Sequence, residues 1–216
     1  MNRFLSIAID GTSASGKTTT ASALSQKYHY LMVSTGGHYR AITRYFLDHG
    51  MKATDVEQAQ NFPPLSLSTV ISPEGVASLT IEGNIYPAED LRSAEVNHYV
   101  SYFAAIPAVR SLLFHYQRSQ VDLAKEKGFN GIVMEGRDIT SVILPDADLK
   151  FFLEASERVR LLRRQQEKES DDLQQRDQLD QSRTIFDPHT VLKINTENLS
   201  LDQVVTIISE AIGRLQ

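Results

Sequence analysis

A glycine-bearing segment near the amino terminus constrains this chain more than any other feature. Residues 11–18 read GTSASGKT, which matches the pattern GxxxxGK[ST]. An apolar run at residues 5–10 precedes the segment, and a helical pattern at residues 17–28 follows it. In that setting glycines allow backbone N–H groups to converge on phosphate oxygens, and the helix start adds partial positive charge. The sequence therefore predicts a nucleotide phosphate site between a strand and a helix, rather than a chance glycine-rich turn.

Two side chains of this phosphate loop have chemical roles of their own. Lys17 can reach the β and γ phosphates of a nucleotide, and the hydroxyl of Thr18 can bind Mg²⁺. Thr18 is therefore the expected metal ligand. The residues of the loop expected to bind the donor nucleotide are Gly11, Thr12, Ser13, Ala14, Ser15, Gly16, Lys17, Thr18 and Thr19.

The alternation of strand and helix patterns predicts an α/β fold with a doubly wound parallel sheet. Further strands are expected at residues 30–33, 131–134, 149–153 and 191–194. Helices are expected at residues 38–49, 91–103, 107–127, from 156 toward 183, and 201–215. Residues 66–88 break the alternation with two short strand-like runs and turn residues between them, which indicates a small antiparallel insertion.

Charge and composition narrow the choice of partners. The chain of 216 residues carries a formal net charge of −5 and contains no cysteine. An acidic balance lacks the field that nonspecific binding to nucleic acid or anionic membrane requires, and the missing thiols exclude a disulfide scaffold and thiolate metal sites. We therefore expect a cytoplasmic monomer that binds small molecules, with no nucleic-acid or membrane partner.

Arginines indicate how an acidic protein would hold phosphate groups. Arg40 and Arg137 follow the second and third predicted strands, and the carboxyl ends of parallel strands meet where the phosphate loop lies. Transfer between two phosphates depends on alignment and charge neutralisation, and an anionic acceptor phosphate needs no general base. We expect both arginines to bind phosphate, and surface salt bridging is the alternative.

Short segments spread over most of the chain share a further pattern. They are IDG at residues 9–11 with SGK at 15–17, STGGHYR at 34–40, LRSAEV at 91–96, PAVR at 107–110, EGRD at 135–138, PDA at 145–147 and RDQLDQSR at 176–183. Together they resemble the bacterial cytidylate kinases. The resemblance implies an ATP-dependent phosphotransferase that acts on CMP or dCMP with Mg²⁺. It also divides a single P-loop domain, residues 1–216, into a core (about 1–61, 104–156 and 184–216), an acceptor-binding insertion (about 62–103) and a shortened helical lid (about 157–183).

The same resemblance implies roles for individual residues. The acceptor phosphate would lie among Thr35, Tyr39, Arg40 and Arg137, the cytosine among Ser101, Arg110, Asp138 and Arg183, and the ribose against Arg176 and Asp180. A carboxylate such as Asp138 can accept from the N4 amino group of cytosine, whereas uracil would present an acceptor to it. The alternative role of Asp138 is the N-cap of a short helix.

Arginines also gather at the start of the penultimate predicted helix. Arg160, Arg163 and Arg164 share one helical face there, next to Arg158. The resemblance makes these three arginines ATP-binding lid residues, and a solvated charged helix is the alternative. The residues expected to act in catalysis are Lys17, Arg137, Arg160 and Arg164.

Departures from the family pattern bear on function. Only eleven residues separate Arg164 from Arg176, a shorter lid than the resemblance leads us to expect. Ser34 stands where an aspartate is expected, and Thr140 where a glycine is. An altered pocket would favour another nucleoside monophosphate, UMP or AMP, as acceptor. A disabled lid would leave a nonenzymatic nucleotide-binding protein.

Overall fold

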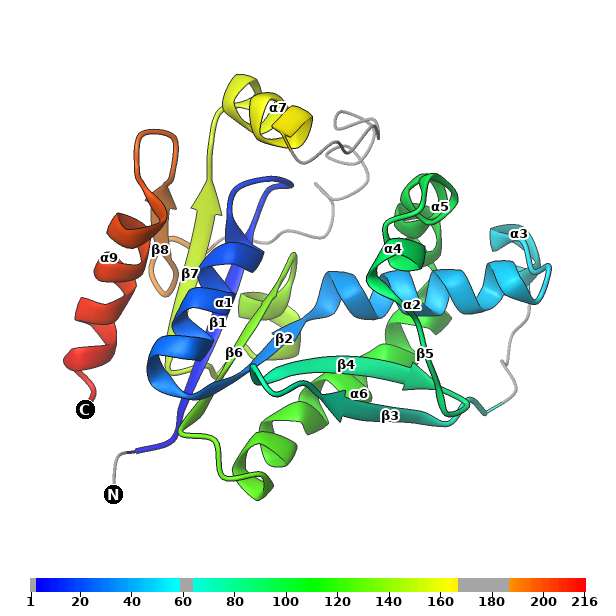
Figure 1. The fold of residues 1–216 in the computed structure, drawn as a ribbon, viewed down its shortest axis with the longest axis horizontal. Coiled ribbons are helices and arrows are strands. Elements are labelled where there is room, and N and C mark those ends of the chain that lie inside the picture. Colours follow the sequence, from blue (N-terminus) through cyan, green and yellow to red (C-terminus); the bar gives the residue numbers. More distant parts are fainter. Residues whose placement is uncertain (1–2, 59–63, 167–186) are drawn as a thin grey trace.

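The computed structural model describes residues 3–58, 64–166 and 187–216. The described strands form an eight-stranded sheet in the order β3-β4-β2-β6-β1-β7-β8, with β5 paired to β4 (Figure 1). The strands are β1 (Leu5–Gly11), β2 (Tyr30–Ser34), β3 (Leu67–Ile71), β4 (Val76–Ile81), β5 (Asn84–Ile85), β6 (Gly131–Gly136), β7 (Leu149–Glu154) and β8 (Leu192–Asn195). The helices are α1 (Lys17–Tyr28), α2 (Thr35–Asp48), α3 (Ala53–Gln58), α4 (Ala88–Leu91), α5 (Ala94–Ala105), α6 (Pro107–Glu126), the π-helical turn η1 (Ile139–Ile143), α7 (Glu157–Gln166) and α9 (Leu201–Gly213).

The central strands β2, β6, β1, β7 and β8 run parallel, which confirms the predicted doubly wound sheet. Both faces of this sheet are covered by helices (Figure 1). On β1, Leu5, Ile7 and Ile9 pack with α1 and α9, whereas Ala8 belongs to the cluster on the other face, with α6 and η1. Alternate side chains of one strand are therefore buried on opposite faces, which explains why the strand reads as an almost continuous apolar run. Among the described residues, no helix combines the length and apolarity needed to span a membrane.

The insertion is antiparallel, as its sequence predicts, but it does not form a sheet of its own. Strands β3, β4 and β5 pair antiparallel, while β4 also pairs in parallel with β2, with Val33 opposite Ala77. An isolated hairpin would leave two rows of backbone groups unpaired, and joining the core sheet satisfies one of them. The insertion is thereby held against the core at β2, the strand that leads into α2.

The helix predicted over residues 91–103 corresponds to α5 and starts later than predicted, because Ser93 is its N-cap. The short α4 ends at Leu91, and α5 begins at Ala94. The hydroxyl of Ser93 accepts a hydrogen bond from the N–H of Val96 at 3.3 Å, the contact typical of an N-cap residue. The sequence analysis also missed the short α3, and it considered η1 only as the short helix that Asp138 would cap.

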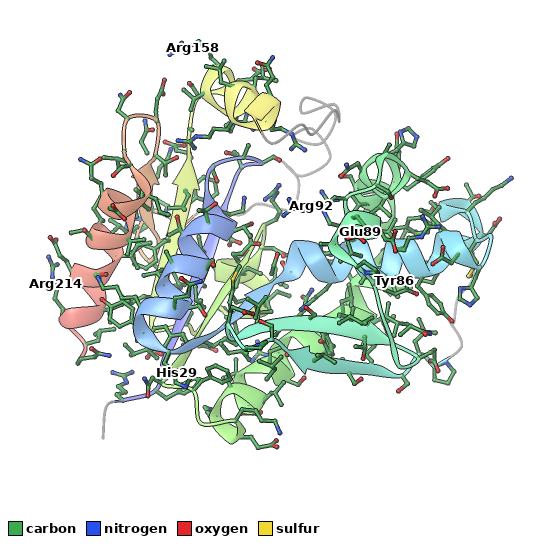
Figure 2. All side chains as sticks on the ribbon, viewed as in Figure 1. His29, Tyr86, Glu89, Arg92, Arg158 and Arg214 are labelled. Carbon is green, nitrogen blue, oxygen red and sulfur yellow. The ribbon has the colours of Figure 1, made fainter. Side chains whose placement is uncertain are left out.

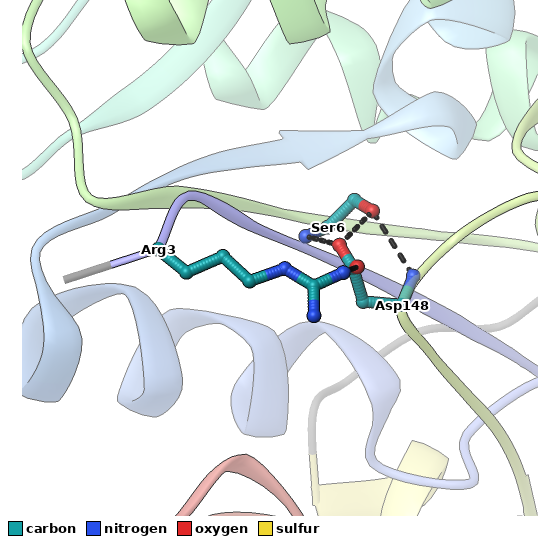
Figure 3. A network of polar contacts seen from close by, with 3 residues as sticks. All are labelled: Arg3, Ser6 and Asp148. Carbon is teal, nitrogen blue, oxygen red and sulfur yellow. Dashed lines mark hydrogen bonds and ion pairs between the residues drawn. The ribbon is translucent and has the colours of Figure 1, made fainter. Parts of the chain in front are cut away.

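A polar network ties the start of β1 to the residue before β7 (Figure 3). Asp148 accepts hydrogen bonds from the N–H of Ser6 at 2.8 Å and from its hydroxyl at 2.7 Å. Arg3 also donates to this carboxylate, at 2.5 Å. The network fixes the amino-terminal end of β1, at the end of the strand opposite to the phosphate loop.

Replacing Asp148 with alanine should lower the free energy of unfolding by about 1–3 kcal/mol, because the N–H and hydroxyl of Ser6 lose a shared partner. Urea denaturation measures the change. Asp122→Ala is a matched control, since the Asp122 side chain is largely exposed and only faces Lys125 at 3.5 Å. Equal effects of the two substitutions would contradict the role given to the network.

His38, on α2, is a buried histidine whose titration should affect stability. The side chain is 1% exposed, and its ring meets that of Tyr116 edge-on with 5.1 Å between centroids. Burial lowers the pKa of His38 from 6.5 to about 4. The unfolded chain therefore binds a proton at a higher pH than the folded protein does, and stability is lost as pH falls through this window.

We expect the substitution His38→Leu to remove this pH dependence. Between pH 7 and pH 4, the free energy of unfolding of the wild type should fall by up to about 3 kcal/mol relative to the variant. Urea denaturation at a series of pH values measures the difference, and His115→Leu, at an exposed position of α6, is the control. A constant gap between wild type and His38→Leu would show that the prediction is wrong.

Candidate active site

The residues predicted to bind phosphate meet at the carboxyl ends of β1, β2 and β6, which are neighbours in the sheet. The phosphate loop follows β1, α2 follows β2, and Arg137 follows β6. A cavity of about 530 Å³ opens there. The predicted site residues that line it are Ser13, Lys17, Thr18, Thr19, Thr35, Tyr39, Arg40, Ser101, Arg110, Arg137, Asp138 and Arg164. The structure thus brings together residues separated by up to 151 positions, from Ser13 to Arg164.

The phosphate loop has the backbone conformation that its glycines predict. Gly11 has φ of 151°, and a Cβ at this position would lie 2.0 Å from the carbonyl oxygen of Leu153. Gly16 is the N-cap of α1 with φ of 91°, in the left-handed region. The Lys17 Nζ donates to the carbonyl of Thr12 at 2.7 Å, so the ammonium lies over the loop.

The two arginines predicted to bind the acceptor phosphate are both held by backbone carbonyls, and Arg40 also by a side-chain amide. Arg40 donates from Nη1 to the carbonyl of Leu91 at 2.7 Å and to Oδ1 of Asn97 at 2.6 Å. Arg137 donates from Nη1 to the carbonyl of Gly11 at 3.0 Å. Arg40 is therefore oriented by the insertion and Arg137 by the phosphate loop, so the two guanidinium groups approach the cavity from different sides.

Asp138 forms an ion pair with Arg110 across the cavity. The guanidinium Nη2 of Arg110 donates to Oδ2 of Asp138. Burial lowers the pKa of Arg110, but the hydrogen bond and the charge of Asp138 outweigh it and hold the pKa above its ordinary value. Asp138 does occupy the N-cap position of η1, yet its side chain makes no capping hydrogen bond. The carboxylate therefore faces Arg110 and the cavity instead of capping the helix.

Glu135 is a site residue that the sequence analysis missed. Its side chain accepts from the hydroxyl of Thr18 at 3.1 Å and from that of Ser34 at 2.5 Å, both at Oε1, and the residue is only 4% exposed. Its position directly after the strand predicted at residues 131–134 was the available signal.

Hydroxyl and carboxylate oxygens are the ligands that Mg²⁺ prefers, so the side chains around Glu135 fit this ion. The described part of the chain contains no cluster of three or more His, Cys, Asp or Glu residues that could hold a metal. A divalent ion here would therefore depend on Thr18, one carboxylate and the oxygens of a nucleotide.

Three arginines of α7 contact the phosphate loop. Arg160 donates to the carbonyl of Ser13 at 3.3 Å, and Arg164 donates to the hydroxyl of Ser13 at 2.7 Å. Arg163 donates to the carbonyl of Ala14 at 3.3 Å. Arg158, in contrast, lies at the outer end of α7, away from the loop (Figure 2). The shared face predicted for the first three is thus the face that contacts the phosphate loop.

Three predicted substrate residues lie outside the described residues. They are Arg176, Asp180 and Arg183. Most of the predicted lid lies outside them as well, and α7 is its described part.

A parallel sheet with a strand, a GxxxxGK[ST] loop and a helix at its carboxyl edge places the chain in the class of P-loop nucleotide-binding proteins. The family model for cytidylate kinase matches residues 7–214. The chain belongs to the cytidylate kinase family.

Curated relatives cover the chain almost end to end. A cytidylate kinase of Exiguobacterium sp. is 36% identical over 234 residues, covering 100% of this chain and 100% of that protein. A cytidylate kinase of Bacillus pumilus is 34% identical over 232 residues, covering 100% and 99%. Among solved structures, a sugar kinase from Janibacter sp. superposes with a TM-score of 0.53 at 11% identity, covering 97% of this chain and 95% of that one. The last likeness concerns the fold alone.

Proposed function

We propose that this protein transfers the γ-phosphoryl group of ATP to CMP or dCMP, which gives CDP or dCDP. Membership of the cytidylate kinase family supports the reaction. The observation that carries the proposal is the ion pair of Arg110 and Asp138, which lies in the same cavity as Lys17 and Arg137. One cavity thus offers a pair of groups for a base and a set of cations for phosphates.

Base selection would depend on the two charged side chains. Asp138 accepts from the N4 amino group of cytosine, and Arg110 donates to the acceptors O2 and N3. Uracil places an oxygen where cytosine has its amino group, which leaves a buried polar group unpaired at a cost of about 1–3 kcal/mol. Ser101 lines the same cavity and would help to hold the base. Arg183 at the base, and Arg176 with Asp180 at the ribose, remain predictions.

Phosphoryl transfer would proceed in line between two phosphates, with cations on both. Arg40 and Arg137 align the acceptor phosphate, with Thr35 and Tyr39 beside it, and its oxygen attacks without a general base. Lys17 moves from the carbonyl of Thr12 to the β and γ phosphates of ATP. Mg²⁺, when bound with ATP, neutralises charge between these phosphates, and Thr18 with Glu135 would hold it.

The arginines of α7 would complete the donor side. Arg164 lines the cavity and so is the one best placed to reach a moving phosphoryl group. Arg160 and Arg163, which bond to carbonyls of the phosphate loop, would support the loop around ATP. Closure of the α7 arginines over the phosphates would exclude water from the site and so prevent ATP hydrolysis. We further propose that the protein acts in the cytoplasm as a monomer.

An assay of ADP release tests the proposal. It uses ATP and Mg²⁺ with CMP, dCMP, UMP or AMP, and a reaction without acceptor reports ATP hydrolysis. We expect turnover with CMP or dCMP well above that with UMP or AMP. Turnover only with another monophosphate would retain the reaction and refute the base assignment. ATP binding without acceptor-dependent turnover would identify a nonenzymatic nucleotide-binding protein.

A further inference from the structure

We infer that Asp10 is a positioning residue that caps η1 in place of Asp138, and so leaves the carboxylate of Asp138 available to select the base. The inference rests on the proposed function, because it concerns the same base-binding residue. It assigns a role in specificity to a residue that lies outside the cavity lining.

The carboxylate of Asp10 is buried and accepts from the first turn of η1. Asp10 lies near the end of β1, in register with Gly136 of β6, and is 1% exposed. Its Oδ1 accepts from the N–H of Ile139 at 2.9 Å. Its Oδ2 accepts from the N–H of Thr140 at 2.8 Å and from the Thr140 hydroxyl at 2.7 Å.

Thr140 lies at position N2 of η1, so its N–H is one that a helix normally offers to its own N-cap side chain. Asp138 occupies that position, and aspartate is among the preferred N-cap residues. Its ψ of 27° nevertheless departs from the extended backbone of a capping residue, and its side chain makes no capping bond. The N–H of Thr140 is already bonded to Asp10, and the carboxylate of Asp138 pairs with Arg110 instead.

The backbone of Asp138 is also held by the same turn. Its carbonyl accepts from the N–H of Val142 at 2.9 Å and from that of Ile143 at 3.2 Å. Asp10 therefore anchors η1 from the sheet side, and η1 in turn anchors Asp138. A single π-helical turn of this kind has few internal bonds, so an outside anchor matters more than it would for a long helix.

Thr140 strengthens this anchor through its side chain. A glycine, the residue that the family pattern leads us to expect here, would supply only its N–H. In this chain the hydroxyl adds a further donor to Oδ2 of Asp10. Burial raises the pKa of Asp10, whereas the hydrogen bonds from Thr140 and Ile139 lower it. The donors thus offset part of the cost of a buried carboxylate.

The test measures equilibrium binding of CMP and of UMP by calorimetry, so it does not depend on turnover. In Asp10→Asn, an amide NH2 group replaces one carboxylate oxygen. This group is itself a donor, so it cannot accept the hydrogen bonds that η1 offers to Asp10. We expect the preference for CMP over UMP to fall about tenfold. Affinity for a nonhydrolysable ATP analogue should stay the same, because the phosphate loop is intact.

Thr140→Val is a milder variant, since it removes only the hydrogen bond from the Thr140 hydroxyl to Asp10 and keeps the N–H bond. Its preference for CMP should fall by about threefold. In an Asp138→Ala background, Asp10→Asn should have no further effect on the preference, because the residue through which it acts is gone. A merely structural role of Asp10 would instead lower stability in both backgrounds and leave the ratio of the two affinities unchanged.

Three results would overturn the inference. They are an unchanged CMP preference in Asp10→Asn, an equal loss of affinity for CMP, UMP and the ATP analogue, and an effect on the preference that persists without Asp138. If Asp10→Asn does not fold, Thr140→Val decides, and a wild-type preference in that variant overturns the inference. A wild-type protein that binds CMP no better than UMP would refute the proposed base selection itself, which is a separate result.

Discussion

Replacing Lys17 with alanine should reduce phosphoryl transfer by at least about a thousandfold, the scale seen when a charge-stabilising group is removed from a transition state. The Lys17 ammonium lies over the phosphate loop, 2.7 Å from the carbonyl of Thr12, at the edge of the cavity. In the proposed reaction it is the loop's own cation for the β and γ phosphates. Alanine leaves the backbone N–H groups in place, so ATP binding should weaken less than turnover does.

The measurement is ADP release with saturating ATP, Mg²⁺ and CMP, together with the affinity for ATP. Lys27→Ala is the matched control, because Lys27 lies in the last turn of the same helix, α1, and donates to the hydroxyl of Ser209 at 2.9 Å. It should keep wild-type turnover. If Lys17→Ala turned over CMP within a few fold of wild type, the role of the phosphate loop in catalysis would have to be abandoned.

Replacing Asp138 with alanine should change the choice of base more than the rate of transfer. The ratio of kcat/KM for CMP to that for UMP is expected to fall by roughly tenfold to a hundredfold, because the acceptor for the N4 amino group is lost. Arg110 stays in the cavity and loses its ion-pair partner, so it can donate to either base. Lys17, Arg40 and Arg137 are untouched, and the phosphate chemistry should therefore continue.

Rates with CMP, dCMP, UMP and AMP under one set of conditions test this expectation. Asp146→Ala serves as the control, since Asp146 is exposed and lies beyond η1, outside the cavity that holds Asp138. Full preference for CMP in Asp138→Ala would show that another group selects the base. A total loss of turnover with every acceptor would place Asp138 in the transfer step instead.

The phosphate loop could be predicted from the sequence because its chemistry is local. Gly11, Gly16, Lys17 and Thr18 are brought together by a single turn between a strand and a helix, so their spacing along the chain already specifies their arrangement. The parallel sheet could also be predicted from the sequence, since alternating strand and helix patterns are compatible with few other topologies. The start of α5 after Ser93 was placed too early, because an N-cap within a helical pattern is a weak signal against the surrounding residues.

The partners of the charged side chains were decided by the tertiary structure. Asp138 read alone suited either an N-cap or a base-binding group, and in the structure it pairs with Arg110. The first turn of η1 instead bonds to Asp10, which is 129 residues from Ile139 in sequence. Glu135 likewise became a candidate site residue only through its hydrogen bond with Thr18, which is 117 residues away in the sequence. The sequence by itself determined the loop, the sheet and the family, because these follow from local spacing and pattern. Asp10 bonds to η1, Asp138 pairs with Arg110, and Glu135 accepts from Thr18 of the phosphate loop. These pairings follow from competition for donors between strand ends, and only the folded sheet brings those ends together.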